Sequence, residues 1–150
     1  MISRIKQLKP SKHSRYEQGY INPTACKKLF DSQRTEPIIF RSSYERRFVN
    51  WLESNPNVKH WGSECVRIPY TYVDNQTHGY YPDYVVEMQN GDVILIEIKP
   101  KNQTIKPDVE NTWAYDTYMR NMCKWKAAKK YCEDRKLKFQ ILTEDTIMKL

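Results

Sequence analysis

The sequence predicts an α/β domain in which a mixed β-sheet is flanked by helices and preceded by a basic N-terminal arm. Two observations support this fold class. Hydrophobic residues recur at helical spacing in two segments and follow strand patterns in the segments around them, which gives the order α-β-β-β-α-β. The 150-residue chain is 39% hydrophobic and 13% aromatic, which is enough for one packed core. We assign residues 1–39 to the arm and residues 40–150 to the folded domain.

The N-terminal arm carries most of the net charge. The whole chain has a formal net charge of +7, and residues 1–30 contain seven Lys and Arg residues against one acid, Glu17, a net of +6. Such a segment attracts polyanions, because binding releases the counterions condensed on them. We therefore expect the arm to contact nucleic acid, with Arg15 and Lys12 as candidate contacts, or an acidic surface of a partner protein. The alternative is a tail that only improves solubility.

The first helix is predicted just after residue 40. Tyr44, Phe48 and Leu52 recur one helical turn apart and form one apolar face. The Asn55-Pro56 pair ends this run, because proline disfavours the helical conformation in the residue before it.

Strand patterns occupy four segments, three of them before a long second helix and one after it. The segments span residues 64–73, 80–88, 92–100 and 137–143. Apolar residues alternate in the first segment, and the loops between strands are rich in Asn, Gln and Gly. The long helix runs from about Thr112 to Arg135 and has aromatic side chains near one face. Its position between the third and fourth strands is typical of a mixed sheet.

The turn between the second and third strands decides which side chains face each other. A two-residue turn at Asn90-Gly91 would pair Tyr84 with Glu97 and mix charged and apolar groups on both faces. A three-residue loop, with Gly91 in the left-handed conformation, leaves one face entirely apolar. A slip of one residue moves every side chain to the opposite face, so we expect the three-residue loop. Asp83 then lies opposite Glu97, with Lys99 on the same face further along the strand.

Asp83 and Glu97 form an acidic pair that calls for a cation. Carboxylates opposite each other repel, and Mg²⁺, or Mn²⁺ in its place, binds one or two carboxylates together with waters and substrate phosphate. The backbone carbonyl of Ile98 is a further candidate ligand. Lys99 is placed to orient an attacking water or to balance charge on a phosphate, which suits phosphodiester hydrolysis. In the alternative interpretation, Asp83 follows Pro82 in a simple turn, and Glu97 and Lys99 are a strand end in solvent.

Further candidates come from other segments. Glu45 is a candidate catalytic residue and third metal ligand, although Ser42 and Glu45 also fit a capping box in which Glu45 bonds to the cap amide. His78, in the loop before the second strand, is a candidate phosphate contact. Lys101 and Lys106 are candidate nucleic-acid contacts in the loop after the third strand. The alternatives are an incidental loop histidine and an ordinary solvated loop.

These residues match a known pattern. Pro82-Asp83 followed by Glu97-Ile98-Lys99 resembles the PD-(D/E)xK nuclease signature, and Glu45 matches the first-helix acid of that superfamily. Longer segments are similar to the head-completion nucleases of T-even-type tailed phages, among them HGYYPDYVVEM, LIEIKP and KWKAAKKYC. That family is related to the TnsA-like nuclease subunit of certain heteromeric transposases. The resemblance covers nearly the whole chain, including the arm.

The resemblance implies a restriction-endonuclease-like core and a metal-dependent DNA nuclease. It implies Asp83 and Glu97 as Mg²⁺ ligands, Lys99 as the catalytic lysine and Glu45 as a supporting acid. It also implies action late in virion assembly, when a DNA-filled head is made competent to join its tail. The expected partners are double-stranded DNA, cut without sequence preference, and portal or neck proteins of the head, in the host cytoplasm or in the virion.

A second hypothesis is a non-catalytic head-closure or DNA-binding protein that keeps a nuclease fold, which the basic arm would also suit. Neither hypothesis involves a membrane, because no apolar run approaches the ~20 residues that a span needs. The N-terminus also lacks an apolar stretch of the signal-peptide type, so we expect the protein to stay in the compartment where it is made.

Overall fold

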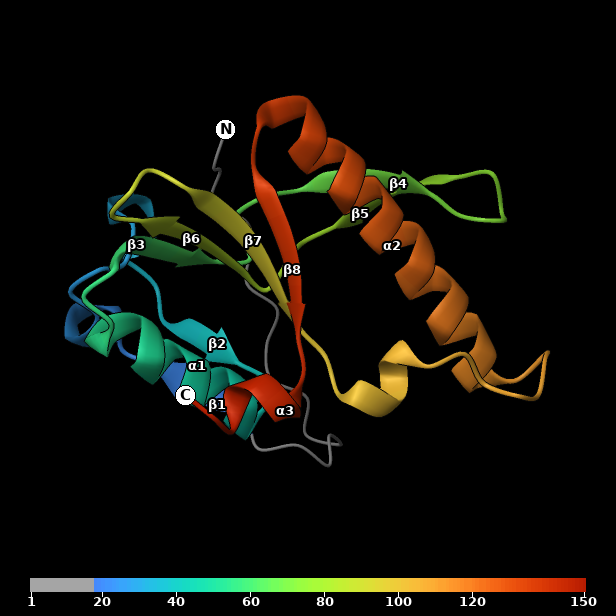
Figure 1. Cartoon of the computed structure of the whole chain (residues 1–150), viewed down its shortest axis with the longest axis horizontal. Coiled ribbons are helices and arrows are strands. Elements are labelled where there is room, and N and C mark those ends of the chain that lie inside the picture. The colour runs from blue at the N-terminus through green and yellow to red at the C-terminus, as the bar shows by residue number, and fades with distance from the viewer. Residues whose placement is uncertain (1–17) are drawn as a thin grey trace.

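The computed structural model describes residues 18–150, and its centre is a four-stranded sheet with the strand order β3-β6-β7-β8 (Figure 1). The strands span Val58–Ser63 (β3), Tyr84–Met88 (β6), Val93–Ile98 (β7) and Lys138–Leu142 (β8). β7 and β8 run parallel, whereas the other neighbours run antiparallel. The predicted mixed sheet flanked by helices is therefore confirmed.

Three helices pack on this sheet. They span Ser43–Ser54 (α1), Trp113–Arg135 (α2) and Glu144–Ile147 (α3). Ser42 caps α1 by accepting the Glu45 N–H at 3.2 Å, and Thr112 caps α2 by accepting the Tyr115 N–H at 3.1 Å. The first two helices match the predicted ones, whereas α3 was not predicted. No helix within residues 18–150 is both long enough and apolar enough to cross a membrane.

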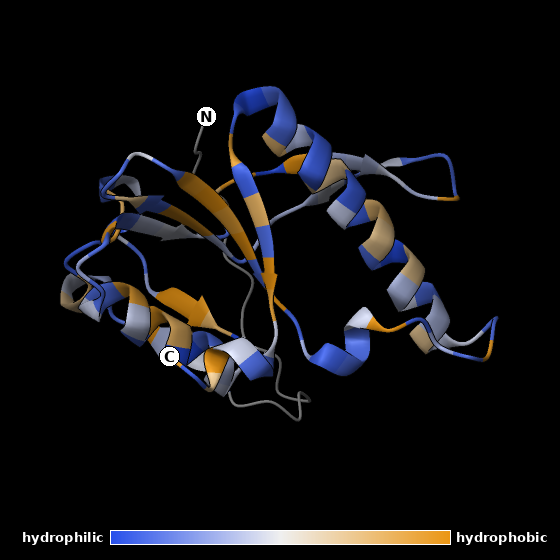
Figure 2. Ribbon diagram, viewed as in Figure 1, coloured by the Kyte–Doolittle hydropathy of each residue, from blue (hydrophilic) through white to orange (hydrophobic). Residues whose placement is uncertain are grey.

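Different elements cover the two faces of the sheet, because side chains alternate along each strand. Tyr84, Val86 and Ile96 belong to a buried cluster shared with α1 and α3. Val85 and Leu95 belong to a second cluster, shared with α2. Figure 2 shows hydrophobic residues concentrated on β6 and β7 and alternating with hydrophilic ones along β8. The sheet is thus the middle layer between two cores.

The first predicted strand is not part of this sheet, which corrects the expected order. Within the predicted segment 64–73, only Ile68–Thr71 (β4) forms a strand. It pairs with Thr77–Tyr80 (β5) in a separate antiparallel ribbon that packs against α2. The strand beside β6 at this edge of the sheet is instead β3, in a segment for which no element was predicted. A bulge between Val58 and His60 breaks its alternation, so periodicity could not reveal it.

The second predicted strand, residues 80–88, is divided in two. Pro82 and Asp83 separate β5 from β6. Proline has no N–H to donate to a neighbouring strand, so a ladder cannot continue through Pro82 as it does through other residues. The division matters for function because Asp83 lies at this break.

Residues 18–39, in the segment expected to form the arm, pack onto the domain. β1 (Gly19–Ile21) and β2 (Ile38–Phe40) form an antiparallel ribbon beside α1 (Figure 1). Leu29 and Ile38 are fully buried in the core on the α1 side, and Leu29 forms a β-bridge with Trp61. Three short 3-10 helices lie at Pro23–Ala25, Asp31–Gln33 and Lys101–Thr104. The packed domain therefore includes residues well before position 40.

Candidate active site

The β6–β7 hairpin has the predicted three-residue loop. Tyr84 pairs with Ile96, as the apolar-face argument required. Gly91 has a φ of 93° and donates its N–H to the Met88 carbonyl at 3.0 Å. A positive φ is costly for a residue with a Cβ, so a glycine at this position makes the loop possible. The confirmed register places Asp83 at the open end of the hairpin, beside the end of β7.

Asp83 is attached to β7 through the backbone. It lies just outside β6, and its Oδ2 accepts the Ile98 N–H at 2.7 Å. Extending the register of Tyr84 places Pro82 opposite Ile98. Because Pro82 has no N–H, this neighbour cannot occupy the Ile98 carbonyl with a ladder hydrogen bond. The carbonyl can therefore serve as an oxygen ligand close to the Asp83 carboxylate.

Glu97 is buried on β7, with only 5% of its surface exposed. Its Oε2 accepts the indole N–H of Trp125 at 3.4 Å and lies 4.0 Å from Nζ of Lys99. Burial raises the pKa of Asp83 well above its usual value, and the nearby Glu97 and Glu45 carboxylates raise it further. The negative charges of Glu97 and Glu45 thus disfavour the charged form of Asp83, and a cation bound between Asp83 and Glu97 would relieve this repulsion.

A surface hollow of about 180 Å³ opens beside Asp83 and Glu45. It is lined by Arg41, Ser42, Tyr44, Glu45, Asp83, Ile98, Lys99, Pro100 and Gln103. The lining joins the start of α1 to the open end of the hairpin and to the turn that follows β7. The structure thus brings together most of the predicted site residues. Glu97 does not line the hollow itself but lies behind it, 4.0 Å from Nζ of Lys99, which does.

Glu45 combines a capping role with a place at the hollow. Its Oε2 accepts the N–H of Arg41 at 3.1 Å and the hydroxyl of Ser42 at 3.4 Å. The capping contact therefore reaches one residue further back than the expected bond to the cap amide. Burial, with a contribution from the Glu64 carboxylate, raises the pKa of Glu45 to about 7.

The donor set at the hollow fits a divalent cation that prefers oxygen ligands. Within residues 18–150, the His, Cys, Asp and Glu side chains form no group of three or more that could hold a metal ion. The protein ligands at hand are two carboxylates and the Ile98 carbonyl, a set that Mg²⁺ and Mn²⁺ accept when waters complete the shell. Within residues 18–150, the buried hydroxyls of Tyr80 and Tyr84 form no hydrogen bond of ordinary geometry, although Tyr80 lies near Glu97 and Tyr84 near Glu45.

Arg41 and Glu64 adjoin the site, although the sequence did not single them out. Nε of Arg41 lies 3.1 Å from Oε1 of Glu64, and the Glu64 N–H donates to the Asp83 carbonyl at 3.0 Å. Burial lowers the pKa of Arg41, but Glu64, Glu45 and Asp83 outweigh it and raise this pKa. One is a basic residue before a helix cap and the other an acid after a strand. Only their tertiary contact, which no sequence pattern encodes, identifies them.

Two predicted nucleic-acid contacts are engaged in local interactions. His78 lies on β5, where its Nε2 is 2.9 Å from Oδ2 of Asp74 and its ring stacks on Tyr70. His78 does not line the hollow that contains Asp83. Nζ of Lys101 lies 3.2 Å from a carboxylate oxygen of Asp145.

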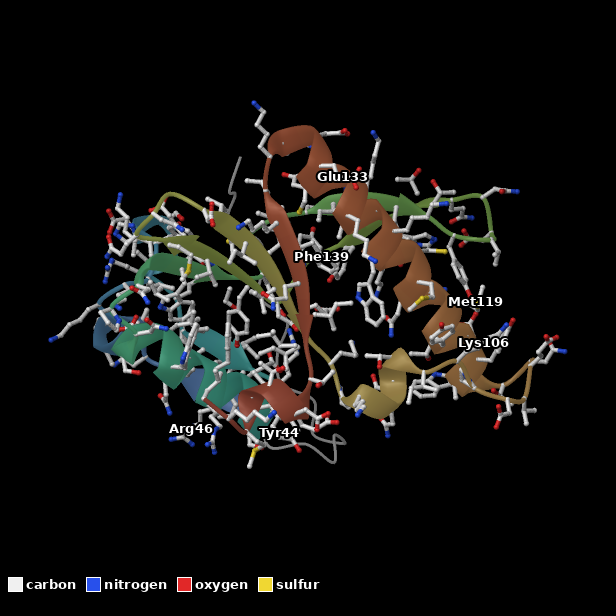
Figure 3. The ribbon with its side chains drawn as sticks, viewed as in Figure 1. Tyr44, Arg46, Lys106, Met119, Glu133 and Phe139 are labelled. Carbon is white, nitrogen blue, oxygen red and sulfur yellow. The ribbon has the colours of Figure 1, made fainter. Side chains whose placement is uncertain are left out.

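The remaining predicted contacts lie away from the hollow or outside the described residues. Lys106 lies beside the start of α2, with its Nζ 5.9 Å from the centre of the Tyr115 ring. Figure 3 shows that Lys106 is well separated from Tyr44, which lines the hollow. Arg15 and Lys12 lie outside the residues that the structure describes.

Comparison with known proteins relates the chain to a family of nucleases. A family model described as the TnsA-like endonuclease N terminal matches residues 55–144. The chain is also 38% identical, over 124 residues, to a protein of Enterobacteria phage T4 named head completion nuclease. That similarity covers 75% of this chain and 83% of the phage protein. The family match runs from β3 to β8 and so includes Asp83, Glu97 and Lys99.

Proposed function

Because the chain belongs to the TnsA-like endonuclease family, we propose that it hydrolyses phosphodiester bonds of double-stranded DNA with a divalent metal, Mg²⁺ or Mn²⁺. The observation that carries this proposal is the meeting of Asp83, Glu97 and Lys99 at the open end of one hairpin. These groups suit contact with phosphate and not with the edges of bases, so we propose cleavage without sequence preference. The endonuclease family supports internal cleavage.

In this proposal each residue of the site has a separate role in the reaction. Asp83, Glu97 and the Ile98 carbonyl would hold the metal, which when bound supplies Lewis acidity that stabilises the charge developing on the phosphate. Lys99 donates hydrogen bonds to the attacking water or to a phosphate oxygen and balances negative charge. Trp125 keeps the Glu97 side chain oriented through its indole N–H.

A plasmid cleavage assay tests the enzymatic part of the proposal. Wild-type protein with Mg²⁺ or Mn²⁺ should nick and linearise supercoiled plasmid, and a chelator should stop the reaction. Asp83→Asn, Glu97→Gln and Lys99→Met should each lower the rate by at least about 10²-fold, a loss expected for groups that act on the transition state.

Glu133→Gln is the matched control, because it makes the same carboxylate-to-amide change. Glu133 lies at the far end of α2, away from Tyr44 and the hollow (Figure 3). We expect this variant to cleave like wild type. If wild type and the three site variants leave the plasmid equally intact under all metal conditions, the nuclease proposal is wrong.

We further propose that the cleavage serves head completion in phage assembly, because the T4 relative bears that name. In this proposal the protein acts in the host cytoplasm on heads filled with DNA. It would contact portal or neck proteins and make the heads competent to join tails.

An assembly experiment separates this role from a purely structural one. Phage that carry Glu97→Gln should accumulate filled heads without tails, although the variant protein folds and is present in normal amounts. Normal assembly with the Glu97→Gln protein would instead support the non-catalytic head-closure hypothesis.

A further inference from the structure

α2 presents two cations, Arg120 and Lys124, on the side that packs against the β4–β5 ribbon. The guanidinium carbon of Arg120 lies 4.2 Å from the centre of the Tyr72 ring, and its Nη1 donates to the Tyr70 hydroxyl at 3.4 Å. Nζ of Lys124 lies 6.0 Å from the centre of the Tyr70 ring and 5.8 Å from that of Tyr80. Tyrosine rings therefore locate both charged groups.

Neither cation forms an ion pair with a carboxylate in the described part of the chain. Asp116, one turn before Arg120 on the same helix, instead accepts the Tyr72 hydroxyl. Lys130, further along α2, pairs instead with Asp134 at 2.9 Å. Asp116 acts on Arg120, and Glu97 and Asp83 act on Lys124, only from beyond ion-pair distance. Both cations can therefore still bind an anion from outside the protein.

Lys124 lies at the end of this pair that is closer to the active site. Burial lowers its pKa, Lys99 lowers it further, and the charges of Glu97 and Asp83 oppose this effect. The next residue, Trp125, donates its indole N–H to Glu97. Arg120 lies one turn further away, over Tyr72, toward the turn of the β4–β5 ribbon.

We propose that Lys124 and Arg120 form a phosphate subsite that holds the DNA backbone next to the scissile phosphodiester, on the β4–β5 side of the active site. This inference rests on the proposed nuclease function. Side chains one turn apart on a helix have Cβ atoms ~5–6 Å apart, so each cation can reach a different phosphate of one strand. The tyrosine rings hold the two cations in place and so lower the entropy cost of binding.

A salt titration of DNA binding tests the subsite without relying on cleavage. In the Glu97→Gln background, anisotropy of a labelled short duplex gives the slope of log affinity against log salt concentration. Each phosphate contact contributes about 0.9 to this slope. Lys124→Met should therefore reduce the slope by about 0.9, the double variant with Arg120→Gln should reduce it by about twice as much, and Lys124→Arg should retain it.

Lys126→Met provides the matched control. Lys126 is exposed on α2, two residues from Lys124 and so on a different face of the helix. This variant should keep the wild-type slope. Thermal unfolding of each variant checks that α2 stays packed on the ribbon. If Lys124→Met lowers Tm strongly, Arg120→Gln decides the test. A slope that neither folded variant changes relative to Lys126→Met overturns the proposal.

Cleavage by the wild-type protein separates failure of this inference from failure of the proposed function. If wild type cleaves plasmid but replacing Lys124 and Arg120 leaves the salt slope unchanged, only the subsite proposal is wrong. If wild type never cleaves but the slope falls as expected, the two cations bind DNA and the nuclease proposal fails.

Discussion

The positions of Pro82 and Ile98 explain how the hydrophobic strand β7 can end in charged residues, Glu97 and Lys99. β7 places Ile94, Ile96 and Ile98 on the α1 side of the sheet, and alternation turns Glu97 to the other face. The Asp83 carboxylate accepts the Ile98 N–H, while Pro82 contributes no N–H to the ladder. The end of the strand is therefore rich in oxygen ligands and poor in donors, which is an arrangement that a cation stabilises.

Metal binding should stabilise the wild-type protein but not a variant without the acidic pair. Addition of Mg²⁺ should raise the Tm of wild type by several degrees, because a ligand at ~100 times its Kd adds about 2.7 kcal/mol to the free energy of unfolding. Asp83→Asn keeps an oxygen that can accept the Ile98 N–H but loses a charged ligand, so its Tm should respond little. Differential scanning calorimetry checks this. An equal rise in both proteins would place the bound metal elsewhere.

Glu45 should make the metal-free protein less stable as pH rises. Its folded-state pKa is raised from 4.5 to about 7, so its contribution to stability is fully present below pH 4.5 and is lost as pH rises through about 7. A shift of this size corresponds to roughly 3 kcal/mol. Glu45→Gln cannot titrate and keeps the capping geometry.

Urea unfolding across this pH range measures the difference between the two proteins. The free energy of unfolding of Glu45→Gln should exceed that of wild type at neutral pH, and the gap should close near pH 4.5. Parallel curves for the two proteins over the whole range would contradict this assignment.

The site residues that the sequence revealed are those joined by short-range rules. One turn connects the two strands, and alternation along them, with Gly91 in the loop, was enough to bring Asp83 and Glu97 to one end of the hairpin. Arg41 and Trp125 were not predicted as site residues, because each reaches the site through a contact between elements far apart in the sequence. Neither periodicity nor spacing encodes such contacts.

At the scale of elements, α2 supports the active site from the side of the sheet opposite α1. Trp125 is buried, with 4% of its surface exposed, and its indole N–H is directed at Glu97. Lys124 and Arg120, on the same helix, face the β4–β5 ribbon. One helix thus orients Glu97, a proposed metal ligand, and presents the proposed phosphate subsite.

Replacing Trp125 should damage catalysis more than folding. Trp125→Phe keeps an aromatic ring in the core but removes the hydrogen bond to Glu97, and loss of such a supporting contact typically costs 10–100-fold in metal affinity or activity. We expect kcat/KM to fall within about that range while Tm falls by only a few degrees. Steady-state cleavage kinetics and thermal unfolding measure the two effects. An unchanged kcat/KM in a folded variant would show that Trp125 only packs.

The predictions of secondary structure were wrong where tertiary contacts, and not the local sequence, determine the conformation. α1 has a clear apolar face and a cap, α2 is long and capped, and both were predictable. β3 contains Lys59, His60 and Gly62, and its strand conformation depends on pairing with β6. The β4–β5 ribbon could not be told from a sheet strand by alternation, because its apolar face is also buried, against α2.

At the scale of the whole molecule, the boundary between arm and domain follows the core. Composition alone suggested a change near residue 40, because the preceding segment is polar and contains several prolines. The structure instead buries Leu29, Ile38 and Cys26 in the core on the α1 side. Fully burying such side chains contributes ~1.5–3 kcal/mol each for Leu and Ile, which is a large part of the stability of a small domain.

Two truncations should therefore behave in opposite ways. Removing residues 1–17 takes away five Lys and Arg residues and one acid but none of the buried side chains described here, so Tm should stay within a few degrees of wild type. Removing residues 1–39 takes away β1, Leu29 and Ile38, and the product should show no cooperative unfolding transition. Circular dichroism on heating measures both results.

The shorter truncation should also reduce the salt slope of DNA binding by about 0.9 for each phosphate contact that the arm makes. If it leaves the slope unchanged, the arm does not hold DNA, and its charge is left for a partner protein or for solubility.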